Sequence, residues 1–373
     1  MGCQNCGMEN APNRVVCQNC GERLTLLTAR TTRSMVHSRL HRQQLLKQSR
    51  AKRCGWSYQR WLLGGLIGCG LIGGGYAVVR HVSAQTAIPA KHSRTTNGET
   101  TRTKAPAAGY FPTAAIRKNI TQALASMNGT TSVAVLPLIG RQAVIVNNQS
   151  QRAGSLITLF IMAAAYEQVH QNNWHMDDYY TLRVEDQVGG TGTLQTLPAG
   201  SQLTYAEITK RMITESDNTA ANIMLARIGG VAAVNAEVTR LGLKETKMAR
   251  RLMDTAALEA GADNYTSVSD VATLLRRLAN HQLISKKADH AMLAILKANT
   301  DHRKLVKNLP TRATVYNKTG DYPAYGVQND AAIVKNHQGT FIMTAMTTAG
   351  DRNGQVLALN QLGQDLYHTI LTR

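Results

Sequence analysis

Three short groups of polar residues stand in order in the C-terminal part of the chain, and their side chains are of kinds that enzymes use. Ser155 begins the apolar run SLITLFIMAAAYEQVH, Ser216–Asp217–Asn218 interrupts a helical pattern, and Lys318–Thr319–Gly320 ends a β-type run. A serine hydroxyl becomes a nucleophile when a base activates it, and a lysine can carry charge or accept a proton. The simpler alternatives are that Ser155 only caps a helix, that Asp217 caps or turns the chain, and that Lys318 is a solvated surface charge.

The order of these groups resembles the serine β-lactamases and penicillin-binding proteins, specifically the class A β-lactamase-like group. The resemblance covers about residues 110–373, with 61 residues from Ser155 to Ser216 and 102 from Ser216 to Lys318. It extends into the flanking sequences MITESDNTAANIML and NKTGDYPAYGVQNDAAIV. One tripeptide would be weak support, whereas ordered groups in matching helix and strand context indicate the fold strongly.

The resemblance implies a role for each residue of the site. Ser155 would be the nucleophile that forms an acyl-enzyme, and Ser216 would pass a proton to the leaving nitrogen. Asn218 would hold the substrate's side-chain amide, while Lys318 and Thr319 would receive its carboxylate. The backbone N–H groups of Ser155 and Asp321 would form the oxyanion hole. The expected catalytic residues are Ser155, Ser216 and Lys318, and the expected substrate-binding residues are Asn218, Thr319, Gly320 and Asp321.

The first departure from the family pattern lies one helical turn after the nucleophile. The family has Ser-x-x-Lys, whereas this chain reads Ser155–Leu156–Ile157–Thr158. Position i+3 lies on the same helical face, where the family's neutral lysine can accept the serine's proton. A threonine hydroxyl is no useful base near neutral pH, and losing a positioned general base costs about 10²–10⁴-fold in rate. Whether Ser155 is acylated without that lysine therefore stays open.

The second departure concerns hydrolysis of the acyl-enzyme. Class A β-lactamases place a glutamate, and four residues later an asparagine, on a loop that positions the hydrolytic water. Ungapped counting back from residues 263–267 puts Arg250 at the glutamate and Asp254 at the asparagine. Asp254 or Glu259 could replace the glutamate only if this loop is rebuilt. The chain thus matches the ligand-binding half of the family's site better than the proton-transfer half.

The elements around these residues predict an α+β domain. Helical patterns cover 116–127, 155–170, 205–228 with a break at the second group, 269–279 with Ser269 as N-cap, and 357–371. Apolar β-branched runs over 131–138 and 142–147 predict a hairpin, and further strands are expected over 314–318, 327–335 and 340–347. Helices between early and late strands indicate a mainly antiparallel sheet that joins both ends of the domain, with flanking helices and a helical subdomain.

The segment 1–22 has the cysteine spacing of a zinc ribbon. Cys3, Cys6, Cys17 and Cys20 form two CxxC pairs, and a glycine follows each pair. Four thiolates enclose a tetrahedral zinc ion and leave no open position, so we expect structural rather than catalytic zinc. The alternatives are chance pairs or disulfides. No metal or other cofactor is expected in the large domain, which contains no cysteine.

A basic stretch and an apolar run follow the ribbon. Residues 1–109 hold 16 of the 42 Lys and Arg residues but 3 of the 23 Asp and Glu residues, a net charge of +13 out of +19. Residues 23–60 contain no acidic residue, and the uncharged run 61–79 is long enough to cross a bilayer. We therefore expect a basic cytoplasmic stretch over 23–60, a single transmembrane helix over 61–82, a linker over 83–109 and an extracellular domain over 110–373.

Two functional interpretations remain open at the level of sequence. The first is a membrane-anchored serine hydrolase of the β-lactamase or D-alanyl peptidase type, which acts on β-lactams or peptidoglycan stem peptides. The second is a non-catalytic protein that binds or senses cell-wall fragments and is coupled to the cytoplasmic ribbon. The ribbon's partner is more plausibly a protein than a nucleic acid, because nucleic-acid binding would leave the large domain unexplained.

Overall fold

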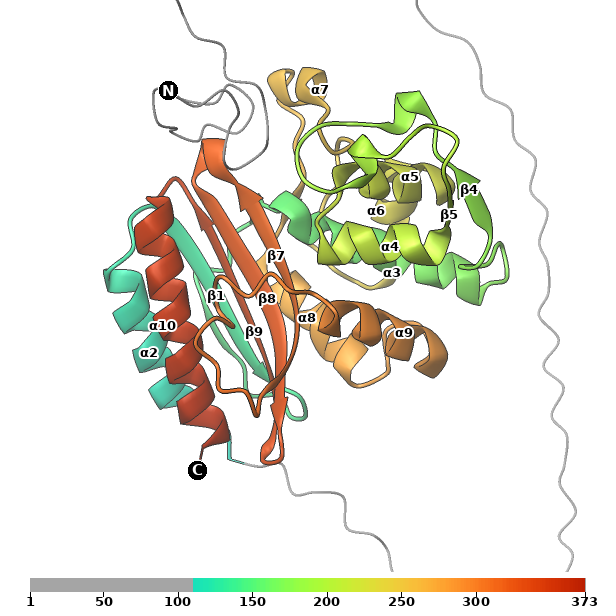
Figure 1. Ribbon diagram of the computed structural model, residues 1–373. Helices are drawn as coiled ribbons and strands as arrows, with labels where there is room; N and C mark the ends of the chain where they lie inside the picture. The colour runs from blue at the N-terminus through green and yellow to red at the C-terminus, as the bar shows by residue number, and fades with distance from the viewer. Residues whose placement is uncertain (1–109, 373) are drawn as a thin grey trace, which may run out of the picture. The chain divides into compact units, whose positions relative to one another are not determined.

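The computed structural model describes residues 110–372, so the expected ribbon, basic stretch, span and linker lie outside the described part of the chain. Its centre is a five-stranded antiparallel sheet with the strand order β2-β1-β9-β8-β7 (Figure 1). The strands of this sheet are β1 (Thr130–Pro137), β2 (Val144–Val146), β7 (Thr314–Tyr322), β8 (Val327–Asn336) and β9 (Gly339–Thr348). There are also two small two-stranded sheets. One pairs β3 (Gln151–Arg152) with β6 (Tyr265–Thr266), and the other pairs β4 (Tyr179–Thr181) with β5 (Gln202–Thr204).

Helices cover both faces of the main sheet. The first and last helices within residues 110–372, α2 (Thr113–Ala125) and α10 (Arg352–Leu371), lie together on one face (Figure 1). On the other face α8 (Val268–Ala279) packs on β1, β8 and β9 and connects to a helical lobe. The remaining helices are α3 (Ile157–His170), α4 (Tyr205–Thr214), α5 (Asn218–Arg227), α6 (Val231–Arg240), α7 (Thr255–Glu259) and α9 (Lys286–Lys297).

Strand β8 shows why the sheet needs helices on both sides. Successive side chains of a strand point to opposite faces. Ala331 and Ile333 accordingly join the core that faces the helical lobe, while Ala332 and Val334 join the core beneath α2 and α10. All four side chains are buried, so a layer that covered only one face would leave half of them in water.

The sheet joins the two ends of the domain, as the sequence predicts. β1 pairs with β9 from Thr130 opposite Thr348 to Pro137 opposite Phe341, although more than 200 residues separate the two strands. The α+β class, the early hairpin and the antiparallel sheet are therefore confirmed. Within residues 110–372, no helix has the length and apolarity that a membrane span requires.

Several element boundaries differ from the sequence-based expectation, and three of these differences have a clear local cause. β7 continues to Tyr322, because its pairing with β8 extends from Thr314 to that residue. α10 starts at Arg352, since the Asp351 side chain accepts a hydrogen bond from Gly354 N and caps an earlier turn. The N-cap of α8 is Ser267 rather than Ser269, because the Ser267 hydroxyl accepts the Asp270 N–H at 3.2 Å.

Candidate active site

Ser155 lies in a tight turn that touches strand β7. It is the middle residue of the 3₁₀ turn η1 (Gly154–Leu156), which runs directly into α3. Gly154 has φ +51°, and a Cβ on Gly320 would lie 2.9 Å from the Ala153 carbonyl oxygen and 3.0 Å from Leu156 N. Glycine at 154 and at 320 thus lets the turn and the strand approach closely. The Ser155 side chain is half-buried at this contact.

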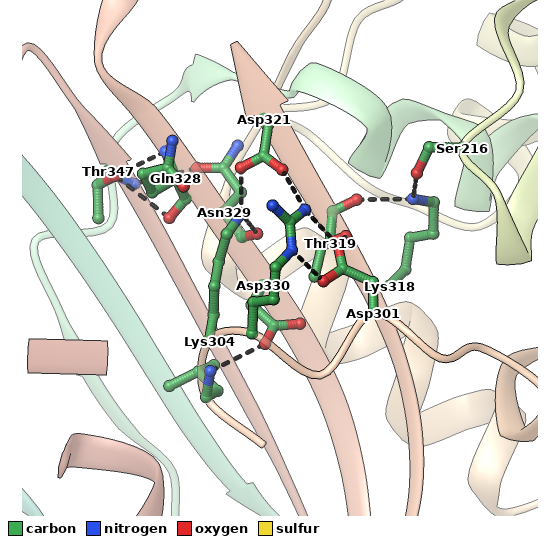
Figure 2. A network of polar contacts seen from close by, with 12 residues as sticks. Ser216, Asp301, Lys304, Lys318, Thr319, Asp321, Gln328, Asn329, Asp330 and Thr347 are labelled. Atoms are coloured by element: carbon green, nitrogen blue, oxygen red, sulfur yellow. Dashed lines mark hydrogen bonds and ion pairs between the residues drawn. The ribbon is translucent and has the colours of Figure 1, made fainter. Parts of the chain in front are cut away.

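Ser216 and Lys318 are joined by a direct hydrogen bond. The Lys318 ammonium donates to the Ser216 hydroxyl and also to the Thr319 carbonyl oxygen, the latter at 2.7 Å (Figure 2). Ser216 lies between α4 and α5 with φ 51°, a left-handed conformation that is uncommon outside glycine. The loop holds it there partly because the Thr191 hydroxyl donates to the Ser216 carbonyl oxygen at 2.6 Å. The second and third groups of the sequence therefore meet in space.

The environment of Lys318 makes its amine a weaker base than an exposed lysine. The side chain is 1% exposed, and burial lowers its pKa from 10.5 to about 8 because desolvation disfavours the charged form. Asp301 and Asp321 act in the opposite direction and limit the decrease. Lys318 is thus a buried amine that can exchange a proton near neutral pH, which excludes the interpretation as a solvated surface charge.

Asp217 and Asn218 hold the loop beside Ser216. Asp217 is the N-cap of α5, where its carboxylate accepts from Ala220 N at 2.8 Å and from Leu194 N at 2.7 Å. The capping interpretation of Asp217 is therefore confirmed. Burial raises the pKa of its carboxyl. Asn218 is the first residue of α5, and its amide nitrogen donates to the Gly189 carbonyl oxygen at 3.1 Å.

Thr158 does not replace the family's lysine. Its hydroxyl donates to the Ser155 carbonyl oxygen at 2.7 Å, which is a bond within the first turn of the helix. The side chain is 2% exposed and fits as part of the core. Within residues 110–372, no hydrogen bond joins a side-chain base to the Ser155 hydroxyl.

The segment in which the family carries its hydrolytic glutamate has an ion pair in this chain. The buried guanidinium of Arg250 pairs with Asp263 at 2.8 Å, and Arg152 pairs with the other oxygen of the same carboxylate. Asp254 caps α7 by accepting from Ala257 N at 3.0 Å, and Glu259 is exposed on that helix. Among the described residues, neither Asp254 nor Glu259 is hydrogen-bonded to Ser155, Ser216 or Lys318.

Sequence reasoning missed a charged cluster at the end of β7. Asp301 accepts the Thr319 hydroxyl at 2.6 Å and pairs with Arg303 at 2.6 Å, while Lys304 pairs with Asp321 (Figure 2). The stretch DHRK, residues 301–304, reads as an ordinary charged loop, and no local spacing signals that it folds against β7. Within residues 110–372, no group of three or more His, Cys, Asp or Glu side chains could hold a metal ion. The four cysteines proposed as zinc ligands lie outside the described residues.

Comparison with other proteins agrees with this arrangement. A profile of the Beta-lactamase enzyme family matches residues 115–370. The β-lactamase of Streptomyces albus G is 30% identical over 180 residues, which cover 47% of this chain and 57% of that protein. The β-lactamase of Streptomyces lavendulae is 29% identical over 161 residues, covering 42% and 52% respectively. The chain thus spans about half the length of the curated relatives it matches.

Solved structures share the fold. A mutant of PBP-A, in an acyl-enzyme complex with penicillin G, has a TM-score of 0.62 at 26% identity, covering 69% of this chain and 96% of that one. The β-lactamase of Sphaerobacter thermophilus has a TM-score of 0.63 at 24% identity, covering 68% and 96%. With the profile match over most of the chain and the meeting of Ser216 with Lys318 beside the Ser155 turn, the protein belongs to the Beta-lactamase enzyme family.

Proposed function

We propose that this chain is a membrane-anchored serine acyl-transfer protein whose extracellular domain recognises β-lactams or peptidoglycan peptides. One observation carries the proposal: buried Lys318 donates to the Ser216 hydroxyl at the strand that packs on the Ser155 turn. The ligand class rests on family membership and on the penicillin G complex of the similar PBP-A structure. The membrane anchor rests on the sequence of residues 61–82.

In the proposed acylation, Lys318 and Ser216 replace the missing lysine of the first turn. The Ser155 oxygen bonds to the carbonyl carbon of the substrate amide as its proton passes to Ser216, whose own proton passes to neutral Lys318. The carbon–nitrogen bond then breaks, and the proton returns through Ser216 to the leaving nitrogen. With a pKa of about 8, roughly a tenth of the lysine is neutral at pH 7, so the base is available but scarce. The backbone N–H groups of Ser155 and Asp321 would hold the oxyanion.

Hydrolysis of the resulting ester would be slow. Arg250 occupies the position counted for the glutamate, and its guanidinium is bound to Asp263 rather than to a water-activating carboxylate. A guanidinium remains protonated in proteins and cannot act as a base. We therefore expect a long-lived acyl-enzyme, as in a penicillin-binding protein, rather than rapid turnover.

Acylation is tested by exposing the purified full-length chain to fluorescent penicillin and measuring its intact mass. The expected result is one covalent adduct per chain that Ser155→Ala abolishes and that decays over hours rather than seconds. Rapid nitrocefin hydrolysis that Ser155→Ala abolishes would show that the deacylation argument is wrong. No adduct after long incubation would remove the acyl-transfer proposal.

The second candidate is a non-catalytic domain that binds cell-wall fragments, and the geometry of Thr158 favours it. Because the Thr158 hydroxyl is bound to a backbone carbonyl, the helix turn supplies no base to Ser155. This candidate predicts that muropeptide binding survives Ser155→Ala. It further predicts that Thr158→Lys gains acylation by about 10²-fold or more over wild type, since a base is restored one turn from the nucleophile. Thr121→Lys, a change of the same kind at an exposed residue of α2, is the matched control and should gain nothing.

A further inference from the structure

Two carboxylates of the chain itself occupy the strand end where a substrate carboxylate would be expected. The Thr319 hydroxyl donates to Asp301 at 2.6 Å, so its proton is already bound to an anion. Lys304, which is 1% exposed, pairs with Asp321 and donates to the Asn329 carbonyl oxygen at 2.9 Å. Arg303 bridges the two carboxylates, at 2.6 Å from Asp301 and 3.2 Å from Asp321. Figure 2 shows these side chains gathered around the β7 strand.

These internal ion pairs reduce the attraction for an external carboxylate. An entering anion would have to displace Asp301 from Thr319, and Asp301 is held at high local concentration because it belongs to the same chain. Burial by itself raises the pKa of the Asp301 carboxyl, but hydrogen bonds from Arg303 and Thr319 together outweigh burial and hold that pKa well below its usual range. Asp301 therefore stays ionised at every working pH, and it repels a second carboxylate.

Lys318 does not compensate for this loss. Its ammonium is buried and already donates to the Ser216 hydroxyl and the Thr319 carbonyl oxygen. Arg303 retains an exposed edge, with 55% of its side chain in contact with solvent. Solvent screening at such an exposed group weakens its pull on an external anion. The cations at this strand end thus have acidic partners or hydrogen-bond acceptors within the chain.

We propose that Asp301 and Asp321 are specificity residues that select acyl donors with a neutral amide or ester beside the reacting bond, against donors with a carboxylate there. The inference rests on the proposed function, because it concerns the ligand of the same site. It narrows the substrate class to peptides or lactams whose group at the end of β7 is uncharged. The resemblance implies that Lys318 and Thr319 receive the carboxylate of a substrate. The carboxylates of Asp301 and Asp321 then take the place of that substrate carboxylate.

The test compares penicillin G with its neutral methyl ester on the full-length chain. Calorimetry gives the Kd of each ligand, and intact mass gives the rate of any adduct at Ser155. In wild type the ester should bind or react at least as well as the acid. Asp301→Asn and Asp321→Asn should each shift the acid-to-ester ratio about tenfold toward the acid, because a charge-assisted hydrogen bond becomes available to the ligand. Asp177→Asn, which removes the same charge from an exposed loop residue, should leave the ratio unchanged.

The possible outcomes distinguish failure of the specificity inference from failure of the proposed acyl-transfer function. If both ligands bind but wild type prefers the acid by tenfold and neither variant changes the ratio, the specificity inference is overturned while the proposed function stands. If neither ligand binds or reacts with any variant that retains the wild-type circular dichroism spectrum, both are overturned. A ratio is used because it cancels any general loss of reactivity in the two variants, and two separate variants guard against misfolding of either one.

Discussion

At the scale of single residues, the proposed chemistry of this site depends on the placement of the buried amine of Lys318. Lys318 loses hydration in the core, which lowers its pKa to about 8, and its ammonium donates a hydrogen bond to the Ser216 hydroxyl. The serine of the first group has no comparable base in its own helix turn, since Thr158 bonds to the backbone. In the proposed acylation, reactivity would therefore depend on Lys318 rather than on a base in the helix turn of Ser155.

This dependence predicts the pH profile of acylation. Lys318 accepts a proton only when it is neutral, and its neutral fraction rises with pH through the folded-state pKa of about 8. The acylation rate should therefore climb about tenfold per pH unit below pH 7 and level off above pH 9. Lys318→Met should lower the plateau by about 10²–10⁴-fold. Stopped-flow or quenched mass measurements between pH 6 and 10 check both points.

The matched control for that profile is Lys335→Met, which removes an exposed lysine from β8. It should retain the rate and the inflection of wild type. A profile that is flat from pH 6 to 10, or an inflection that survives in Lys318→Met, would show that another group supplies the base.

At the scale of elements, the contact between η1 and β7 decides whether the groups form one site. Gly320→Ala would place a Cβ 2.9 Å from the Ala153 carbonyl oxygen, and the strand and turn would have to separate. We expect a loss of about 1–3 kcal/mol in the free energy of unfolding, as in other overpacked cores. Acylation at Ser155 should fall more than stability alone explains, because the proposed oxyanion hole, the backbone N–H groups of Ser155 and Asp321, would span this contact. Urea titration and the acylation rate are the two measurements.

Gly339→Ala is the control on the same sheet. A Cβ there would meet only the Leu371 side chain, at the ordinary contact distance of 3.5 Å, so stability and reactivity should stay close to wild type. If Gly320→Ala matched this control in both measurements, the close approach of η1 to β7 would matter neither for stability nor for acylation.

The elements also show what a sequence can and cannot reveal. The apolar β-branched runs at the two ends of the domain predict the strands, because a sheet that is covered on both faces buries both sides of a strand, as at residues 331–334 of β8. The helix α9 was missed, although Ser285 as N-cap and the i, i+4, i+8 spacing of Ala288, Met292 and Leu296 would have signalled it. Ala291, Leu293 and Ile295 flank this stripe and pack against the same core.

Some residues of the candidate site can be predicted from the sequence, and others can be seen only in the tertiary structure. The sequence predicts Ser155, Ser216 and Lys318 as site residues because each belongs to a short ordered group, and the hydrogen bond between Ser216 and Lys318 brings two of those groups together. Asp301 and Lys304 were not found, because their contacts with Thr319 and Asp321 depend on how the loop between α9 and β7 returns to the strand. Such contacts come from tertiary structure and leave no period or spacing in the sequence.

At the scale of the whole molecule, the account predicts a metal content set by the N-terminal segment alone. We propose that Cys3, Cys6, Cys17 and Cys20 bind one structural zinc ion on the cytoplasmic side of the membrane. The full-length chain should contain one zinc per molecule, and substitution of Cys3 and Cys6 by serine should abolish it. Elemental analysis and native mass spectrometry measure this directly. Removal of zinc by a chelator should leave penicillin acylation unchanged, because no metal is expected in the large domain.

The matched control is Cys54→Ser together with Cys69→Ser, which lie in the basic stretch and the expected span and should not change the zinc content. A chain without zinc, or one whose zinc survives loss of Cys3 and Cys6, would contradict the ribbon. It would leave the acyl-transfer proposal intact, since the two rest on separate parts of the sequence.

The most direct test of the central claim is the intact mass of the full-length protein after incubation with penicillin G and with its methyl ester. The account predicts a single covalent adduct from at least one of the two, mapped by peptide mass spectrometry to Ser155 and absent from Ser155→Ala. An unmodified chain after prolonged exposure to both reagents, with the folded state verified by circular dichroism, would contradict it.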